Sequence, residues 1–227
     1  MTEPTNILVT QNECLENDNA LIIFIKNPQL GKVKTRLAAT VGNEKALEIY
    51  HILTQHTHVI VNDLKATKYL YYSDFVDVND SWQNDKFQKL VQFAGQDLGL
   101  KMASAFSDTA NKKHKKALII GSDCLELTQK ILDDAYDLLS DNEVVIGPAS
   151  DGGYYLIGFS FERIGENSDK TFEKIFFNKQ WSHENVCTEA IHACVEMNIN
   201  YSLLPTLTDV DEEKDYLNTQ HLALKFR

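Results

Sequence analysis

Short apolar runs alternate with amphipathic stretches along the chain, and this pattern predicts an α/β protein. The runs LIIFI at residues 21–25 and ALII at residues 117–120 are too short for helices, and each ends in a polar loop. Runs of this kind are typical of strands that are buried on both faces of a mostly parallel sheet. Further strands are expected at residues 69–72, 87–93, 143–146, 154–157 and 201–204.

Apolar residues with helical spacing fill several of the intervals between these strands. One helix is expected over residues 43–63, and another follows residues 96–102. Thr128 and Ser182 have the character of N-caps of two later helices. With 227 residues and 43% hydrophobic content, the chain can bury one substantial core, so a single domain is expected.

The segment KALIIGSDCLEL, residues 116–127, is the unit around which we expect a functional site. Its strand stops at Gly121 and is followed at once by Ser122 and Asp123. Open α/β sheets bind their ligands at the carboxyl ends of such strands. An aspartate in this position often only caps a turn, but Thr128 is better placed for that task. Asp123 is therefore a candidate ligand for a hard cation such as Mg²⁺, provided that a phosphate site lies nearby.

The loop after residues 21–25, with the sequence KNPQLGKVKTRL, is basic. Four cations and no acid fall within eleven residues: Lys26, Lys32, Lys34 and Arg36. Gly31 allows backbone N–H groups to approach a ligand, and the loop runs towards a helix, as phosphate-binding loops do. It is neither a P-loop nor a dinucleotide fingerprint. The structural alternative is a solvated loop that balances nearby acids.

This loop stands out because the whole chain is acidic, with a formal net charge of −11 at pH 7. Nucleic acid and anionic membrane surfaces would repel such a chain, so neither is an expected partner. No apolar run approaches the roughly 18 residues of a membrane span. The four cysteines form no C-x-x-C pair and the N-terminus carries no signal pattern, so a cytoplasmic protein with reduced cysteines is expected.

Residues 147–159, with the sequence GPASDGGYYLIGF, combine a turn motif with aromatic residues. Asp151, Gly152 and Gly153 predict a tight turn with positive φ that joins two strands as a hairpin or as an excursion from the sheet. A hairpin alone accounts for these three residues. The adjacent Tyr154 and the preceding Pro148 favour, in addition, a substrate rim at which the glycines admit a ligand close to the backbone.

Near the C-terminus, Asp209 and Asp211 alternate on an extended stretch, so their carboxylates are expected on one face of the chain. Capping of a helix that begins at Glu212 would explain these acids structurally. The functional alternative is a second metal ligand or a contact with an acceptor. No covalent nucleophile is expected, because Ser122 and Cys124 have no identifiable base.

Taken in order, these motifs resemble a bacterial family of glycosyltransferase-like proteins of unknown function. The matching stretches are LIIFIKNPQLGKVKTRLA, the Q-x-L-G-x-x-M run at residues 96–102, GSDCLEL, GPASDGGYYLIG, the Trp-Ser pair at 181–182 and TDVDEEKDY. Members of this family are distantly similar to 2-phospholactate guanylyltransferase and molybdenum-cofactor guanylyltransferase. The resemblance covers about residues 20–220. It implies a single-domain three-layer α/β/α sandwich of the GT-A, nucleotide-diphospho-sugar transferase type, with the nucleotide at the strand ends.

The resemblance also implies roles for individual residues. Lys32 and Arg36 would face nucleotide phosphates, Asp123 would hold Mg²⁺ or Mn²⁺, and Asp211 is favoured as a second metal ligand. The complete expectation comprises three sets: Asp123, Asp151 and Asp211 as catalytic residues; Lys26, Gly31, Lys32, Lys34, Arg36 and Ser122 as the nucleotide and phosphate site; and Gly152, Gly153 and Tyr154 as the acceptor rim.

Two features depart from the family pattern. Leu125 stands where the family usually has proline, which should alter the turn only slightly. Residues 1–20 lie outside the pattern and are expected to form an N-terminal arm before a domain at residues 21–227. Two roles are left open for this arm: a contact in an oligomer, such as a homodimer, or a lid.

Two classes of function follow from these observations. One is a Mg²⁺- or Mn²⁺-dependent transferase that uses a nucleotide or nucleotide-sugar donor and a small acceptor. The other is a nucleotide-binding module without turnover, which would need fewer acids near an anion. Only one basic cluster follows a core strand, and the Gly- and Tyr-rich second region suits a neutral acceptor. This composition favours glycosyl transfer from a nucleoside diphosphate sugar over nucleotidyl transfer from a nucleoside triphosphate.

Overall fold

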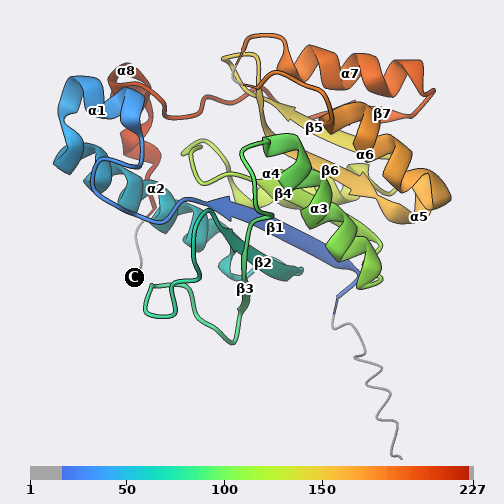
Figure 1. The fold of residues 1–227 in the computed structure, drawn as a ribbon, viewed down its shortest axis with the longest axis horizontal. Coiled ribbons are helices and arrows are strands. Elements are labelled where there is room, and N and C mark those ends of the chain that lie inside the picture. Colours follow the sequence, from blue (N-terminus) through green and yellow to red (C-terminus); the bar gives the residue numbers. More distant parts are fainter. Residues whose placement is uncertain (1–16, 182, 225–227) are drawn as a thin grey trace, which may run out of the picture.

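The computed structural model describes residues 17–181 and 183–224, within which seven strands form one sheet in the order β3-β2-β1-β4-β6-β5-β7 (Figure 1). The strands are β1 Asn19–Ile25, β2 Thr67–Tyr72, β3 Phe87–Val91, β4 Lys116–Ile120, β5 Val144–Pro148, β6 Tyr154–Ser160 and β7 Tyr201–Leu203. All run parallel except β6, which is antiparallel to β4 and β5. The mostly parallel sheet expected from the sequence is confirmed.

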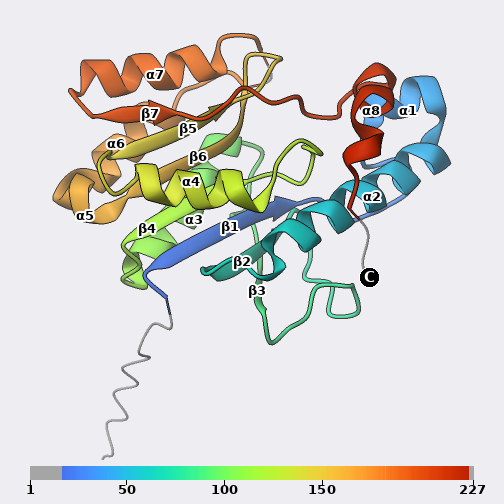
Figure 2. The same cartoon turned by 180° about the vertical axis from the view of Figure 1, so that it is seen from behind.

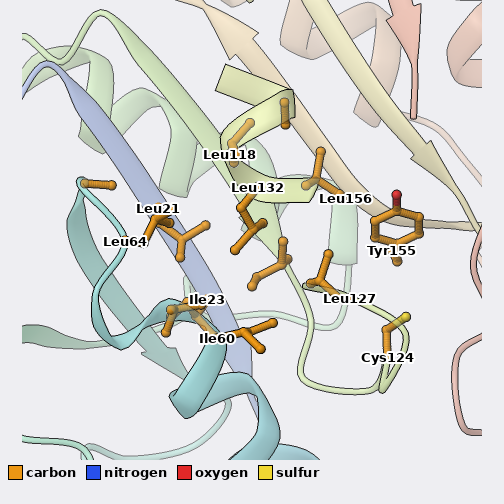
Figure 3. Close-up of a cluster of buried hydrophobic side chains, with 14 of the residues drawn as sticks. Leu21, Ile23, Ile60, Leu64, Leu118, Cys124, Leu127, Leu132, Tyr155 and Leu156 are labelled. Atoms are coloured by element: carbon orange, nitrogen blue, oxygen red, sulfur yellow. The ribbon is translucent and has the colours of Figure 1, made fainter. Parts of the chain in front are cut away.

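Helices cover both faces of this sheet. On one face, α2 (Asn43–Asn62) and α4 (Gln129–Leu138) pack over Leu21 and Ile23 of β1 (Figures 2 and 3). On the other face, α3 (Leu98–Asn111), α6 (Ser168–Phe176) and α7 (Val186–Glu196) pack over Ala20 and Ile22. Successive β1 side chains point to opposite faces, and a strand covered on both sides must be apolar throughout. The three-layer α/β/α sandwich is therefore confirmed.

The remaining helices are short. They are α1 Thr35–Val41, α5 Phe161–Ile164 and α8 Glu213–Thr219, with 3₁₀ turns at Gly165–Asn167 and Gln220–Leu222. α8 lies beside α1 and α2 in both views (Figures 1 and 2). Leu37 of α1, Ile49 of α2 and Val210 belong to one buried apolar cluster, against which Tyr216 of α8 packs. This cluster holds the 209–211 stretch next to the basic loop that precedes α1.

The centre of the sheet aligns two loops. Ile23 of β1 pairs in parallel with Ile120 of β4, so the basic loop and the Ser122–Asp123 turn leave the sheet at the same edge. The Thr128 hydroxyl accepts a hydrogen bond from the backbone N–H of Ile131 at 3.3 Å, which confirms Thr128 as the N-cap of α4. Asp123 is thus not needed as a helix cap.

Several boundaries differ from those expected. β1 begins at Asn19, so two residues assigned to the N-terminal arm belong to the sheet, and β3 ends at Val91 rather than at residue 93. The helices between residues 161 and 176 were not anticipated. Residues 1–16 and Ser182, with its expected helix cap, lie outside the described part of the chain. No described helix combines the length and the apolar character that a membrane crossing requires.

Candidate functional site

A cavity of about 530 Å³ opens at the carboxyl ends of β1 and β4. Its wall is built from the loops that follow β1, β3 and β4, from the start of α3, from Tyr154 and Tyr155 of β6, and from the 209–211 stretch. Seven of the expected site residues line it: Lys26, Lys34, Arg36, Ser122, Asp123, Tyr154 and Asp211. Groups distant in sequence thus meet at the sheet edge where open α/β proteins bind ligands.

Lys34 lies between two carboxylates at the centre of this site. Its Nζ is 2.8 Å from Oδ2 of Asp123 and 3.3 Å from Oδ1 of Asp211. Only 6% of the Lys34 side chain is exposed. Burial by itself would lower the pKa of this ammonium, but the charges of Asp123 and Asp211 outweigh burial, so the pKa is raised above its ordinary value. Lys34 is therefore a fully charged cation at the acids.

Arg36 approaches the same acids from the solvent side. Its guanidinium pairs with Asp211, and 65% of its side chain is exposed. Lys32 is exposed and makes no ion pair within the described part of the chain. Gly31 has φ +74° and sits in a turn closed by a hydrogen bond from Lys32 N–H to the Gln29 carbonyl at 3.0 Å. The turn itself requires glycine there.

Tyr50 anchors the start of the basic loop from α2. Its hydroxyl accepts from the backbone N–H of Lys26 and donates to the Lys26 carbonyl, both at 2.8 Å. Burial and the nearby Asp123 charge raise the pKa of this phenol, an effect that the Ser122 side chain opposes. Ser122 is itself buried. Tyr50 thus fixes the chain where it leaves β1, a role that a helical apolar pattern does not reveal.

The 209–211 stretch is tied to the turn after β4. The backbone N–H of Val210 donates to the Asp123 carbonyl at 2.8 Å, and that of Thr208 donates to a carboxylate oxygen of Glu126 at 2.6 Å. Glu126 had no expected role, although it lies three residues after Asp123. These contacts explain how acids almost ninety residues apart in the sequence come to share one cavity.

Asp209 is the most perturbed acid of the site. Burial raises the pKa of its carboxyl to about 7, with the charges of Asp123, Asp211 and Asp151 acting in the same direction and Lys34 opposing them. Asp209 is absent from the expected site, since a single sequence does not show which of two alternating acids has the perturbed pKa. Helix α8, which follows this stretch, is capped by Glu212 and Asp215, so neither Asp209 nor Asp211 serves as its capping residue.

The Asp-Gly-Gly turn joins β5 to β6, and its residues lie in different surroundings. Gly152 has φ +92°, and a Cβ there would lie 2.0 Å from the Glu184 carbonyl oxygen. The Asp151 carboxylate accepts from Gly153 N–H at 2.9 Å. Tyr154 lines the main cavity, whereas Asp151 lines a neighbouring hollow of about 220 Å³. The close approach of the Glu184 backbone therefore explains why a glycine stands at position 152. The role of Gly152 at an acceptor rim stays a prediction.

Gln92, which directly follows β3, also lines the cavity and had no expected role. Its side-chain amide donates to the Tyr71 carbonyl at 3.2 Å and to the Ile25 carbonyl at 3.5 Å. Both amide hydrogens are thus committed to the protein. Gln96 and Lys101 both belong to the Q-x-L-G-x-x-M run at residues 96–102, and they line the same end of the cavity as Gln92. This end of the cavity combines them with Leu98 and Met102.

The carboxylate oxygens of the site are of the kind that binds a divalent metal ion. Asp123 and Asp211 both reach one point, which the Lys34 ammonium marks. Mg²⁺ and Mn²⁺ prefer oxygen ligands, and Mg²⁺ often uses one or two carboxylates with water and substrate phosphate. The described residues contain no group of three or more His, Cys, Asp or Glu side chains arranged to hold an ion. The two carboxylates fit a cation that completes its shell with water and phosphate.

The fold defines the class: it is that of the nucleotide-diphospho-sugar transferases. A candidate nucleotide-diphospho-sugar transferase from Desulfovibrio desulfuricans G20 shares 27% identity with a TM-score of 0.74, over 86% of this chain and 83% of that one. The chain belongs to the family described as "Uncharacterized protein conserved in bacteria (DUF2064)", whose pattern matches residues 57–182. The resemblance to a bacterial family of unknown function is therefore confirmed.

Two more distant structures share the fold alone. 4-Diphosphocytidyl-2C-methyl-D-erythritol synthase from Anaerococcus prevotii DSM 20548 has 9% identity and a TM-score of 0.58, covering 91% of this chain and 98% of its own. Rv0371c from Mycobacterium tuberculosis H37Rv, solved with manganese, has 13% identity and a TM-score of 0.50, covering 90% and 97% respectively. No curated protein matches the sequence.

Proposed function

We propose that this protein is a divalent-metal-dependent glycosyltransferase that uses a nucleoside diphosphate sugar as donor. The observation that carries the proposal is the meeting of Asp123, Asp211, Lys34 and Arg36 in one cavity at the carboxyl ends of β1 and β4. A site that only bound an anion would not need carboxylates beside its cations. Acids and bases together suit a ligand made of a diphosphate and a metal ion.

The donor's diphosphate is assigned to the basic loop. Arg36 is exposed on the open side of the acids, so its planar guanidinium can exchange the Asp211 contact for a bidentate grip on phosphate. Lys34 contributes a point charge from within. Asp123 and Asp211 would hold Mg²⁺ or Mn²⁺, which supplies positive charge to the departing diphosphate. Lys34 and Arg36 then stabilise negative charge on the phosphate oxygens from the protein side.

The hollow next to the cavity supports a neutral acceptor. It is lined by the acids Asp151, Asp209, Asp211, Glu212 and Asp215, together with Ser150, Thr208, Arg36 and Lys214. A phosphorylated acceptor would meet five carboxylates there, whereas a sugar or another hydroxyl-rich molecule would find hydrogen-bond acceptors. This charge distribution favours glycosyl transfer over nucleotidyl transfer to a phosphate.

A nucleotidyltransferase that uses a nucleoside triphosphate is the second candidate. The observation that favours it is the presence of Lys26 and Lys101 on the cavity wall, which supply further positive charge for a longer phosphate chain. The two candidates release different products from the donor. The test is a panel of nucleoside diphosphate sugars and nucleoside triphosphates incubated with the protein and Mn²⁺. Slow release of a nucleoside diphosphate from one sugar nucleotide supports the proposal, and release of pyrophosphate from a triphosphate alone reverses it.

A further inference from the structure

The carboxylates assigned to a metal ion are already bridged by a cation of the protein. Within the described residues, only Lys34 pairs with both Asp123 and Asp211, because Arg36 reaches Asp211 alone. Two positive centres cannot share these oxygens without strong repulsion in a partly buried site. A divalent ion that used both carboxylates would therefore have to displace the Lys34 ammonium.

Displacement leaves the ammonium in need of a partner. The Lys34 side chain is almost fully buried, so an ammonium that lost its two carboxylates would be a poorly solvated charge unless another anion reached it. Its backbone is also constrained, since φ 47° and ψ 47° place it in the left-handed region and its carbonyl accepts from Ala38 N–H at 2.8 Å. The side chain can move only within the cavity, where a donor phosphate would lie.

We propose that Lys34 is an internal counter-cation that competes with the divalent metal for Asp123 and Asp211. Its ammonium leaves these carboxylates only when an anionic phosphate binds it. Metal and donor then bind with positive coupling, and each raises the affinity for the other by the same factor. The identity of the anion rests on the proposed function, whereas the competition between Lys34 and metal does not. The protein thereby avoids holding a metal ion tightly when no donor is present.

The test measures Mn²⁺ binding to the full chain without any nucleotide, by the loss of the free-ion signal in electron paramagnetic resonance. The wild-type protein should bind Mn²⁺ weakly, and Lys34→Met should bind it about tenfold tighter or more, since a charge-assisted contact with each acid is removed. Lys32→Met removes the same charge from an exposed residue outside the ion pairs and should match the wild type. Arg36→Met leaves Lys34 between both acids and should gain far less affinity than Lys34→Met.

Lys34→Gln is the second variant, because it keeps a hydrogen-bond donor beside the acids if the methionine variant does not fold. Thermal melts with and without Mn²⁺ accompany each titration, and Mn²⁺ should stabilise either Lys34 variant more than the wild type. Equal or weaker Mn²⁺ binding by a folded Lys34 variant overturns the proposal. So does a Lys34 variant that Mn²⁺ fails to stabilise, because a metal that replaces the ammonium must restore the lost charge balance.

A second arm adds inorganic pyrophosphate, with correction for the Mn²⁺–pyrophosphate complex in solution. Pyrophosphate should raise the Mn²⁺ affinity of the wild type by a larger factor than that of Lys34→Met. An equal factor in both proteins overturns the coupling through Lys34. If both arms succeed and no donor is turned over, the proposed function fails while this inference stands.

Discussion

The ammonium of Lys34 lies 2.8 Å from the carboxylate of Asp123, although the two residues belong to different strand-to-helix loops. The contact exists because β1 and β4 are neighbours in parallel register and their loops leave the sheet at one edge. Asp211 joins them from the C-terminal stretch, which hydrogen bonds hold against the turn after β4. The candidate site therefore depends on three segments whose positions are fixed separately, and each segment can be tested by itself.

The basic loop is tested by comparing nucleosides with nucleotides. Arg36→Ala and Lys32→Ala should each weaken binding of a nucleoside diphosphate by about tenfold to a hundredfold, since each removes one charge-assisted contact to phosphate. Binding of the corresponding nucleoside should be nearly unchanged. Calorimetric titration of both ligands into each variant measures the difference. Equal weakening of nucleoside and nucleotide would place these residues away from the phosphates.

Glu126 is predicted to secure the C-terminal segment of the site. Its carboxylate accepts from the backbone N–H of Thr208, so Glu126→Ala should lower the free energy of unfolding by about 1 to 3 kcal/mol. It should also weaken donor binding, because the stretch that carries Asp211 loses a tether. Urea unfolding provides the measurement, with Glu48→Ala as control, since among the described residues Glu48 forms an ion pair only with Lys45, at an exposed position. Equal stability of the two variants would contradict the role of Glu126.

Gly152 is predicted to matter for packing. Gly152→Ala would bring Cβ to 2.0 Å from the Glu184 carbonyl oxygen in a backbone with φ +92°, so a loss of about 3 kcal/mol or more is expected. Gly165→Ala is the matched control, because Gly165 also has positive φ, at +57°, but nothing lies within 4 Å of the added atom. The control should lose only about 1 kcal/mol. Thermal melts that rank the two variants equally would show that the contact with Glu184 yields easily.

His56 gives the protein a predicted sensitivity to acid. Its Nδ1 accepts from Leu224 N–H at 3.2 Å, so Nε2 must carry the proton that it donates to the Leu127 carbonyl at 3.0 Å. Burial lowers the pKa of this imidazole below its ordinary value of 6.5. The unfolded chain therefore binds a proton more readily than the folded one as the pH falls below that value, and stability is lost on acidification.

His56→Gln removes this titration, so its free energy of unfolding should fall less than that of the wild type between pH 7 and about pH 5. Urea unfolding at three pH values measures both slopes. His51→Gln, at an exposed position of the same helix, is the control and should follow the wild type. Parallel slopes for wild type and His56→Gln would contradict the neutral, buried histidine.

Much of the fold could be predicted because apolar runs such as residues 21–25 and 117–120 allow few other structures. The Thr128 cap and the positive φ of Gly152 followed from local chemistry in the same way. The helices at residues 161–176 could not be predicted in the same way. Residues 161–176 are divided into a four-residue helix, a 3₁₀ turn and a nine-residue helix, each too short to show a clear helical period.

The residues that line the candidate cavity could be predicted only in part, and their arrangement could not be predicted. Local sequence marks a cation or an acid, but it does not show that Lys34 is buried between two acids while Lys32 faces solvent. It likewise does not show that the pKa of Asp209 is raised, nor does it reveal that Tyr50 and Glu126 hold the loops. These properties arise from contacts between segments far apart in the chain, which a periodic pattern does not encode.

The central claim is that Asp123 holds a divalent ion through which the nucleotide donor binds. Asp123→Asn keeps the size of the side chain and removes the charge that balances metal and phosphate. Calorimetric titration of a nucleoside diphosphate with and without Mn²⁺ tests this directly. The wild type should bind the nucleotide only when Mn²⁺ is present, and Asp123→Asn should bind it weakly and independently of Mn²⁺. An unchanged, Mn²⁺-dependent affinity in Asp123→Asn would contradict the account.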